Sequence, residues 1–230
     1  MIRRNLAAIL SGIMIISLVS CSPSNNKKTE EGTTPAKTSM LADEEVPFIG
    51  EGEWASDYTR DEVTELNDEI TERIEEVANF LGLEYLKEEK IKDENSQSVN
   101  EKYIYFDNLD PEPNKIESMY YGFKVYGSDM ATGNLNLKIG LRLDLELIKN
   151  EDKFNLKETS ISNFSEAMTN DTERDYSEIN EKIIDIVKNQ NSNGTIETNL
   201  NGLVETITIK DEFLLYKLDS KMYDFKKNLN

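Results

Sequence analysis

The chain has 230 residues, of which 37% are hydrophobic; 26 Lys and Arg against 45 Asp and Glu give a formal net charge of −19. This length and apolar content suit one domain with a packed core. The negative charge argues against nucleic-acid binding and against electrostatic docking on anionic lipid. The sequence holds no histidine and a single cysteine, Cys21. These two facts exclude Ser-His-Asp and Cys-His catalysis, histidine-ligated zinc and an intrachain disulfide.

The first 21 residues carry the most specific motif. Arg3 and Arg4 precede an uncharged apolar run at 6–19, which has the length of a signal-peptide core and is shorter than the roughly 20 residues of a membrane-spanning helix. The run ends in Leu-Val-Ser-Cys at 18–21. This segment resembles the lipobox of bacterial lipoproteins. The resemblance implies that residues 1–20 form a signal peptide that is removed. It also implies that Cys21 receives a diacylglyceryl group and becomes the first residue of the mature protein.

A lipid on Cys21 would place the protein at the extracytoplasmic face of the cell membrane. Residues 22–47 are rich in Ser, Asn, Lys, Thr, Glu, Gly and Pro, a composition that buries too little apolar surface to fold alone. We therefore expect three segments: a signal peptide at 1–20, a lipidated cysteine with a flexible tether at 21–47, and a single α+β domain at 48–230.

Two elements of the domain have clear periodicity. Thr59 and Glu62 form a capping-box pair, followed by apolar residues at spacings of three and four as far as Leu81, which predicts a helix of about 22 residues. From Asn134 to Leu147, apolar and polar residues alternate without interruption. This alternation predicts a long strand with one buried and one wet face.

Weaker patterns predict the other elements. A second amphipathic helix contains Tyr176 and Val187, with Thr172 as its cap, and a return strand begins at Phe154 after a turn at 149–152. The remaining predicted strands are 102–107, 118–127, Thr195–Leu200, Leu203–Lys210 and Phe213–Leu218, with Asn201-Gly202 as a turn. The order predicts an α+β fold with a curved antiparallel sheet, a long N-terminal helix and a second helix before the C-terminal strands.

Aromatic residues gather in the first two of these strands. Strand alternation places Tyr120 and Tyr126 on the face opposite Tyr121 and Phe123, so that one set faces the core and the other is free. With Tyr103 and Tyr105 of the preceding strand, Tyr120 and Tyr126 form a candidate platform for a partner protein, a peptide or a glycan, because tyrosine offers amphipathic contact area at low entropic cost. Ordinary cross-strand packing would give the same pattern.

Two groups of carboxylates deserve comparison with known chemistry. Asp144 and Glu146 share a face of the predicted strand at about the separation that glycosidases use, although Arg142 and Lys138 beside them favour a solvated, salt-bridged surface. Asp107, Asp110 and Glu112 form an acidic loop that could offer oxygen ligands to calcium. The loop lacks the ligand spacing and the sixth-position glycine of an EF-hand, so an acidic turn is favoured and no metal is expected.

The sequence therefore predicts a non-catalytic, membrane-anchored lipoprotein of the cell envelope that binds another protein. No phosphate loop, dinucleotide-binding fingerprint or nucleophile elbow occurs, and we expect no cofactor. One alternative is a carrier that holds a lipid or other apolar ligand in the concave face of the sheet. A second is an enzyme that acts on the cell wall with carboxylates alone.

Overall fold

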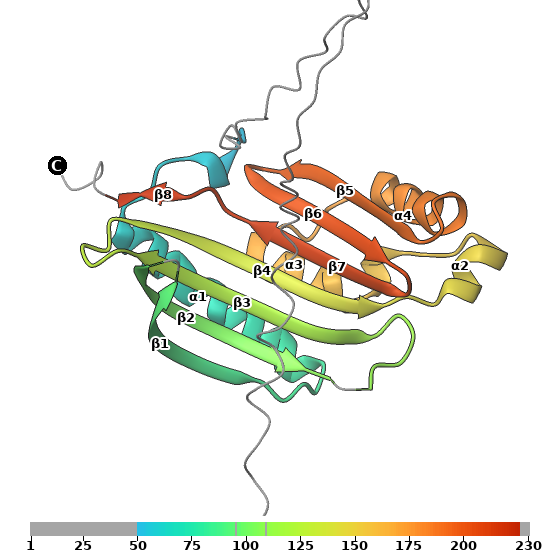
Figure 1. Ribbon diagram of the computed structural model, residues 1–230, viewed down its shortest axis with the longest axis horizontal. Helices are drawn as coiled ribbons and strands as arrows, with labels where there is room; N and C mark the ends of the chain where they lie inside the picture. The colour runs from blue at the N-terminus through green and yellow to red at the C-terminus, as the bar shows by residue number, and fades with distance from the viewer. Residues whose placement is uncertain (1–49, 95, 109, 226–230) are drawn as a thin grey trace, which may run out of the picture. The chain divides into compact units, whose positions relative to one another are not determined.

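The structure, a computed structural model, describes residues 50–94, 96–108 and 110–225. The predicted signal peptide at 1–20 and the whole of the predicted segment at 21–47, Cys21 included, lie outside these residues. An eight-stranded antiparallel sheet runs through the described part in the order β1-β2-β3-β4-β7-β6-β5, with β8 paired to β4 (Figure 1). The strands are β1 (Leu86–Glu94), β2 (Gln97–Asp107), β3 (Ile116–Tyr126), β4 (Thr132–Arg142), β5 (Asn193–Leu200), β6 (Leu203–Lys210), β7 (Phe213–Asp219) and β8 (Tyr223–Asp224).

Among the described residues, four α-helices and two short 3-10 helices accompany the sheet, and this mixture confirms the predicted α+β class. The sheet is open, with β1 at one edge and β5 at the other. Helices α1 and α3 lie behind the sheet in the view of Figure 1. The helices are η1 (Glu53–Ala55), α1 (Arg60–Phe80), α2 (Leu145–Glu151), η2 (Leu156–Glu158), α3 (Ser160–Thr169) and α4 (Ser177–Asn189).

Helix α1 begins as the sequence predicts. The Thr59 side chain accepts a hydrogen bond from the Glu62 backbone N–H at 3.2 Å, and the Thr59 N–H donates to the Glu62 carboxylate at 2.7 Å. This reciprocal capping satisfies two donors at the start of the helix. The apolar stripe behind it is buried, with Val63, Ile70 and Ile74 each 0% exposed.

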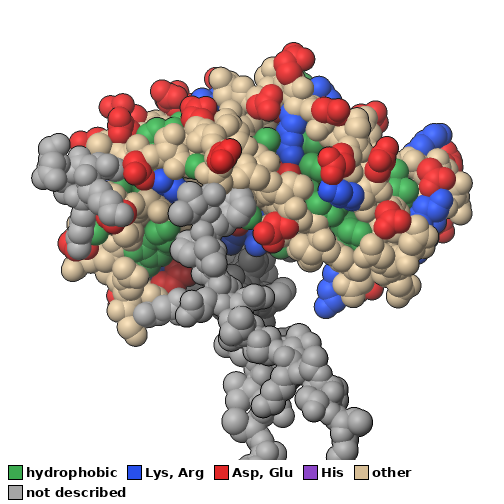
Figure 2. Space-filling view, turned by 90° about the horizontal axis from the view of Figure 1, so that it is seen from above, with side chains coloured by type: hydrophobic (Ala, Val, Ile, Leu, Met, Phe, Trp, Pro, Cys, Tyr) green, Lys and Arg blue, Asp and Glu red, His purple; other side chains and the backbone are tan. Residues whose placement is uncertain are grey.

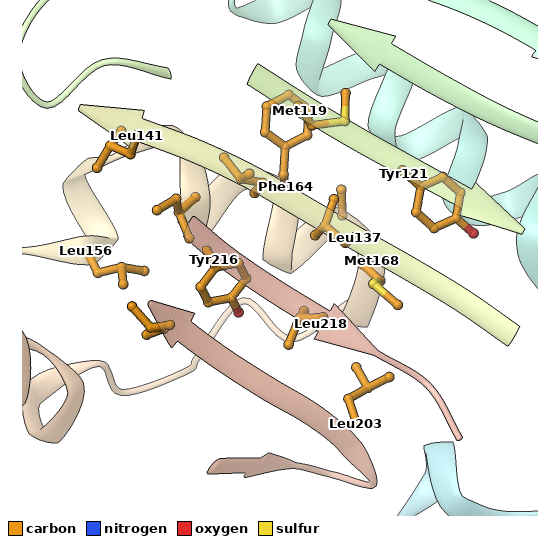
Figure 3. Close-up of a cluster of buried hydrophobic side chains, with 14 of the residues drawn as sticks. Met119, Tyr121, Leu137, Leu141, Leu156, Phe164, Met168, Leu203, Tyr216 and Leu218 are labelled. Carbon is orange, nitrogen blue, oxygen red and sulfur yellow. The ribbon is translucent and has the colours of Figure 1, made fainter. Parts of the chain in front are cut away.

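The alternating row of β4 forms the centre of the core. Leu135, Leu137, Ile139 and Leu141 are each 0% exposed. Figure 3 shows labelled side chains of this row beside Phe164 and Met168 of α3 and Tyr216 and Leu218 of β7. The pattern therefore identified the buried face of this strand correctly, from 135 to 141.

The predicted strand Asn134–Leu147 is too long, because β4 ends at Arg142 and helix α2 begins at Leu145. The carboxylate of Asp144 accepts a hydrogen bond from the Leu147 N–H at 3.0 Å and so caps α2. The Asp144 N–H in turn donates to the Asn114 side chain at 3.0 Å. An aspartate at this position favours the start of a helix over a continued strand, since its carboxylate satisfies a free backbone N–H of the first turn.

The predicted turn at 149–152 and the return strand at Phe154 are also wrong. Residues 149–151 belong to α2, and η2 and α3 follow instead of a strand. Two side chains set the starts of these helices: Asn155 accepts from the Lys157 N–H at 3.1 Å and Thr159 accepts from the Ile161 N–H at 3.2 Å. Helix α4 has Tyr176 rather than the predicted Thr172 at its N-cap.

The C-terminal strands agree with the prediction. Strands β5 and β6 pair from Asn193↔Lys210 to Leu200↔Leu203, and β7 returns beside β6. Asn201 and Gly202 form the two-residue turn with φ of 52° and 97°. Positive φ at both positions is typical of the type I′ turn, whose twist matches that of the flanking strands.

A charge in the β4 row tests this assignment of faces. We expect Leu141→Asp to lower the free energy of unfolding by at least about 3 kcal/mol, because the carboxylate would be buried without a partner. Urea unfolding followed by circular dichroism measures the change. Thr206→Asp is the matched control, since Thr206 lies on the opposite face beside Lys217 and an added carboxylate there stays within about 0.5 kcal/mol of wild type. Equal stability of the two variants would contradict this assignment, and a loss confined to Thr206→Asp would mean that the faces are reversed.

Candidate functional site

The two faces of the sheet differ in what covers them. Helices α1 and α3 pack on one face, and we call the opposite one the open face. The strand register places all four platform tyrosines there, because Tyr105 pairs with Tyr120, Val99 with Tyr126 and Tyr103 with Gly122, while Tyr121 lies in the core at 1% exposure. All four are half-buried. The structure thus brings together the residues that alternation assigned to one face.

Two of these tyrosines form a stacked pair over a glycine. The rings of Tyr103 and Tyr120 lie 5.9 Å apart at an angle of 22°. A Cβ added to Gly122 would lie only 2.2 Å from the Tyr120 hydroxyl, so the ring of Tyr120 occupies the space that a side chain would fill. Aromatic coverage of a strand glycine compensates for the missing side chain. Gly122 therefore allows the close approach on which the stack depends.

The Tyr120 hydroxyl donates a hydrogen bond to Glu101 at 2.6 Å. Glu101 is an acid on a strand and yet is 3% exposed, with lysine ammonium groups of Lys92 at 2.9 Å, Lys90 at 3.6 Å and Lys124 at 3.8 Å. Burial alone would raise the pKa of Glu101, but the hydrogen bond from Tyr120 and the lysines hold it below its usual value. The carboxylate is therefore charged and tied to β1 and β3 together.

Tyr120 is correspondingly hard to ionise. Burial, and then the hydrogen bond to Glu101, raise its pKa. On its other side the Lys138 ammonium lies 5.6 Å from the ring centroid. Burial lowers the pKa of Lys138, and the neighbouring Lys124 and Lys217 add to this effect. This part of the open face therefore places lysine ammonium groups beside aromatic rings. Such an arrangement favours contact with a partner over proton transfer at neutral pH.

Three exposed apolar side chains also lie on the open face, one on edge strand β1 and two on β7. Leu86 pairs with Tyr105, Leu215 with Gly140 and Phe213 with Arg142, which places all three on the tyrosine side. Leu86 is 60% exposed, Phe213 45% and Leu215 40%. The sequence analysis did not single out these residues, although the alternation of the last strand already separates Phe213 and Leu215 from the buried Leu214 and Tyr216. Exposed apolar side chains on one face are typical of interaction surfaces.

The acidic loop follows β2 and is described except at residue 109. Asp107 ends β2, where burial and then a hydrogen bond to Asp107 raise the pKa of Tyr105 to about 12. The Asp110 N–H donates to the Asn108 side chain at 3.3 Å. In the described part of the chain, no group of three or more Asp, Glu, Cys or His side chains is placed to hold a metal ion. Asp107, Asp110 and Glu112 are thus not brought together as ligands.

The pair Asp144 and Glu146 also differs from expectation. The two residues do not share a strand face, since Asp144 caps α2 and Glu146 lies in the first turn of that helix. Asp144 is engaged with the Leu147 N–H. The strand geometry that suggested a comparison with glycosidases is therefore absent at this pair. The predicted lipidation site, Cys21, lies outside the described residues.

A second buried acid lies on the helix-covered face, and the sequence analysis did not find it. Glu205 of β6 is 1% exposed and forms a 2.6 Å ion pair with Arg174, while the Thr198 hydroxyl donates to the same carboxylate oxygen at 2.6 Å. Arg174 also donates to the Tyr216 hydroxyl at 3.1 Å and lies over the Tyr176 ring at 4.6 Å. These contacts fasten the segment between α3 and α4 to the sheet. Because Arg174 pairs with the acid, the charge of Glu205 is compensated within the fold.

Comparisons with known proteins give no relative: no family model, no curated protein and no solved structure matches this chain. Among the described residues, no helix has the length and apolar character needed to cross a membrane.

The buried carboxylate on the open face gives a testable pH dependence. The pKa of Glu101 is lowered from 4.5 by folding, so its contribution is complete above about pH 5 and is lost as the pH falls through the folded value. We expect Glu101→Gln to cost about 1–3 kcal/mol near neutral pH, and this difference to shrink below about pH 4.5. Urea unfolding at a series of pH values measures it.

Glu197→Gln is the control for this experiment, because Glu197 is an exposed acid on β5 and its change stays within about 0.5 kcal/mol at every pH. A difference between wild type and Glu101→Gln that grows on acidification would contradict the lowered pKa.

Proposed function

We propose that this protein is an extracytoplasmic, lipid-anchored binding module of the bacterial cell envelope that holds another protein against the open face of its sheet. The observation that carries the proposal is the grouping of four tyrosines with exposed Leu86, Phe213 and Leu215 on the face opposite α1 and α3. A monomer with no partner gains nothing from exposing such a group, since each apolar side chain left in water forgoes burial energy.

The size of the open face suits a protein partner. Strands of 7 to 11 residues extend about 23–36 Å at roughly 3.3 Å per residue, and seven strands at a spacing of about 4.8 Å span about 29 Å. The face therefore offers on the order of 800 Å², which is about the area that each partner contributes to a standard interface. Tyrosine is enriched in binding hot spots, and four tyrosines of β2 and β3 lie on this face.

The carrier alternative requires a curved sheet with unfilled space under the helices. The inward row of β4 instead contacts bulky side chains of the core, including Phe164 and Met168. The grooves found around the described residues, including one of about 420 Å³ between α1 and β2, are lined mainly by charged and polar side chains. These observations favour a protein partner over an apolar ligand.

In-cell cross-linking tests the proposal directly. We would place a photoreactive amino acid at Leu215 or Tyr105, irradiate intact cells, and purify the chain through a C-terminal tag for mass spectrometry. We expect one dominant cross-linked protein from each position. The same reagent at Glu69, an exposed residue of α1, is the matched control and should give none. Equal yields from Glu69, or a co-purifying lipid without a cross-linked protein, would overturn the proposal.

The anchor is tested separately from the partner. We expect Cys21→Ser to release the protein from membranes or to leave it at the size of the unprocessed chain, because the acceptor of the lipid is gone and a single acyl chain or none binds a bilayer only marginally. Cell fractionation with immunoblotting measures both outcomes. Full membrane retention at the mature size would contradict lipidation at Cys21.

A further inference from the structure

The two edges of the sheet are built differently. Strand β1 carries seven charged residues among its nine, including Lys87, Lys90 and Lys92. Lysines and other charges along an edge strand discourage the addition of another strand. Strand β5 reads Asn-Gly-Thr-Ile-Glu-Thr-Asn-Leu, with Glu197 as its one charge and no lysine or proline. The β5 edge therefore lacks the protection that β1 has.

The register shows which backbone groups of β5 are free. Leu200 and Leu203 flank the two-residue turn and so form a hydrogen-bonded pair. In an antiparallel ladder every second residue pair beyond them is hydrogen-bonded as well. The backbone N–H and C=O groups of Thr195, Glu197 and Asn199 consequently point away from β6. Within the described part of the chain, no other segment hydrogen-bonds to the backbone of these three residues. They form a ready template for an added strand.

Helix α4 runs beside this edge and makes it a groove. The groove has a volume of about 530 Å³, and its lining includes Ile186 of α4 and Thr195 and Ile196 of β5. We call it the edge groove. Ile186 and Ile196 are 4% and 7% exposed, so they give it an apolar floor. An extended segment that paired with β5 could bury alternate side chains against that floor.

The charge of the edge groove defines the segment that fits it. Glu178, Glu181, Asp185 and Glu197 line it, against the single cation Lys182. The Lys182 ammonium is already paired with Glu178 at 2.6 Å. Figure 2 looks down on the molecule from the β5 side of Figure 1 and shows acidic side chains predominating over basic ones. A second copy of this chain would bring two acidic grooves together, which costs free energy, whereas Lys or Arg side chains would be attracted.

We propose that the edge groove binds an extended, basic segment of a partner protein, which adds to the sheet as a strand beside β5 and places its Lys or Arg side chains among the carboxylates of α4. This surface is separate from the open face, and the inference stands whether or not the open face binds a protein. Backbone pairing provides the affinity in this mode, and the side chains on either side provide the selectivity.

The test uses the purified protein and three synthetic peptides. The first repeats Lys-Lys-Val-Val over eight residues, so that each face of the added strand carries both lysine and valine. The second replaces each lysine by glutamate, and the third is the lysine peptide with N-methyl groups on alternate amides, which block pairing with β5. We expect the lysine peptide alone to bind, with a dissociation constant below about 1 mM. It should also slow hydrogen exchange at the amides of Thr195, Glu197 and Asn199.

Two variants show where the peptide binds. We expect Thr195→Pro to reduce affinity at least tenfold, because it removes a donor at a position where an edge strand tolerates proline. We expect Glu181→Gln with Asp185→Asn to weaken binding about tenfold as well. The matched control is Glu69→Gln with Glu72→Gln on α1, which removes the same charge from another surface and should leave affinity unchanged.

Several outcomes would overturn the inference. These are binding weaker than about 1 mM, equal binding of the glutamate or N-methylated peptide, or an equal loss in the α1 control. Sedimentation that showed a dimer broken by Thr195→Pro would assign the edge to a second copy instead. Because the probes are isolated peptides, none of these results depends on the cross-linking that tests the open face.

Discussion

The pairing of β4 with β7 is the interaction on which the rest of the structure depends. It joins the meander β1–β4 to the meander β5–β7 through seven paired positions, from Asn136↔Asp219 to Arg142↔Phe213. About 70 residues separate the two strands along the chain, so closing this contact is entropically costly. Burial of the facing rows offsets that cost, since the inward residues of both strands at this seam are at most 1% exposed. Helix α3 then covers the seam, as the bulky side chains in Figure 3 show.

Two buried acids hold the segments around this seam in place. Glu101 on the open face connects β1 and β3 through three lysines and Tyr120, while Glu205 on the helix side connects β5 and the segment before α4 through Thr198 and Arg174. An ion pair removed from water stabilises little in net terms, because desolvation offsets the attraction. Its effect is to penalise arrangements in which the partner is missing. Each acid therefore specifies the register and docking of its neighbours more than it adds stability.

The sequence predicted local features well and contacts between distant segments poorly. The capping box at Thr59, the buried row of β4 and the turn at Asn201-Gly202 follow from residues close together in the chain, and the structure has all three. Strand β1 was not predicted because most of it is exposed and charged, which leaves no apolar alternation to detect. Helix α2 was hidden because leucines at 143, 145 and 147 continue the alternation of β4 while Asp144 acts as a cap.

In the candidate site, too, local features were predicted and contacts between distant segments were not. Alternation within β3 was enough to separate Tyr120 and Tyr126 from the core, because a strand side chain can point only to one of two faces. The role of Glu101 could not be inferred, since its partners come from β1 and β3 and depend on a register that the sequence does not state. Likewise Glu205 resembles any polar residue in an alternating strand until Arg174, 31 positions away, is placed beside it.

The open face and the edge groove would recognise partners by different physics. On the open face a partner would contact the tyrosines and the exposed apolar side chains, and three of the lysines there already lie against the Glu101 carboxylate, so association depends mainly on burial. In the edge groove the carboxylates of α4 have few cations beside them, and the backbone of β5 offers unpaired donors and acceptors. Salt screens exposed charges within about 8–10 Å at physiological ionic strength. Association at the groove should therefore weaken as salt rises while association at the open face persists, so one chain with a net charge of −19 can distinguish two kinds of partner by charge alone.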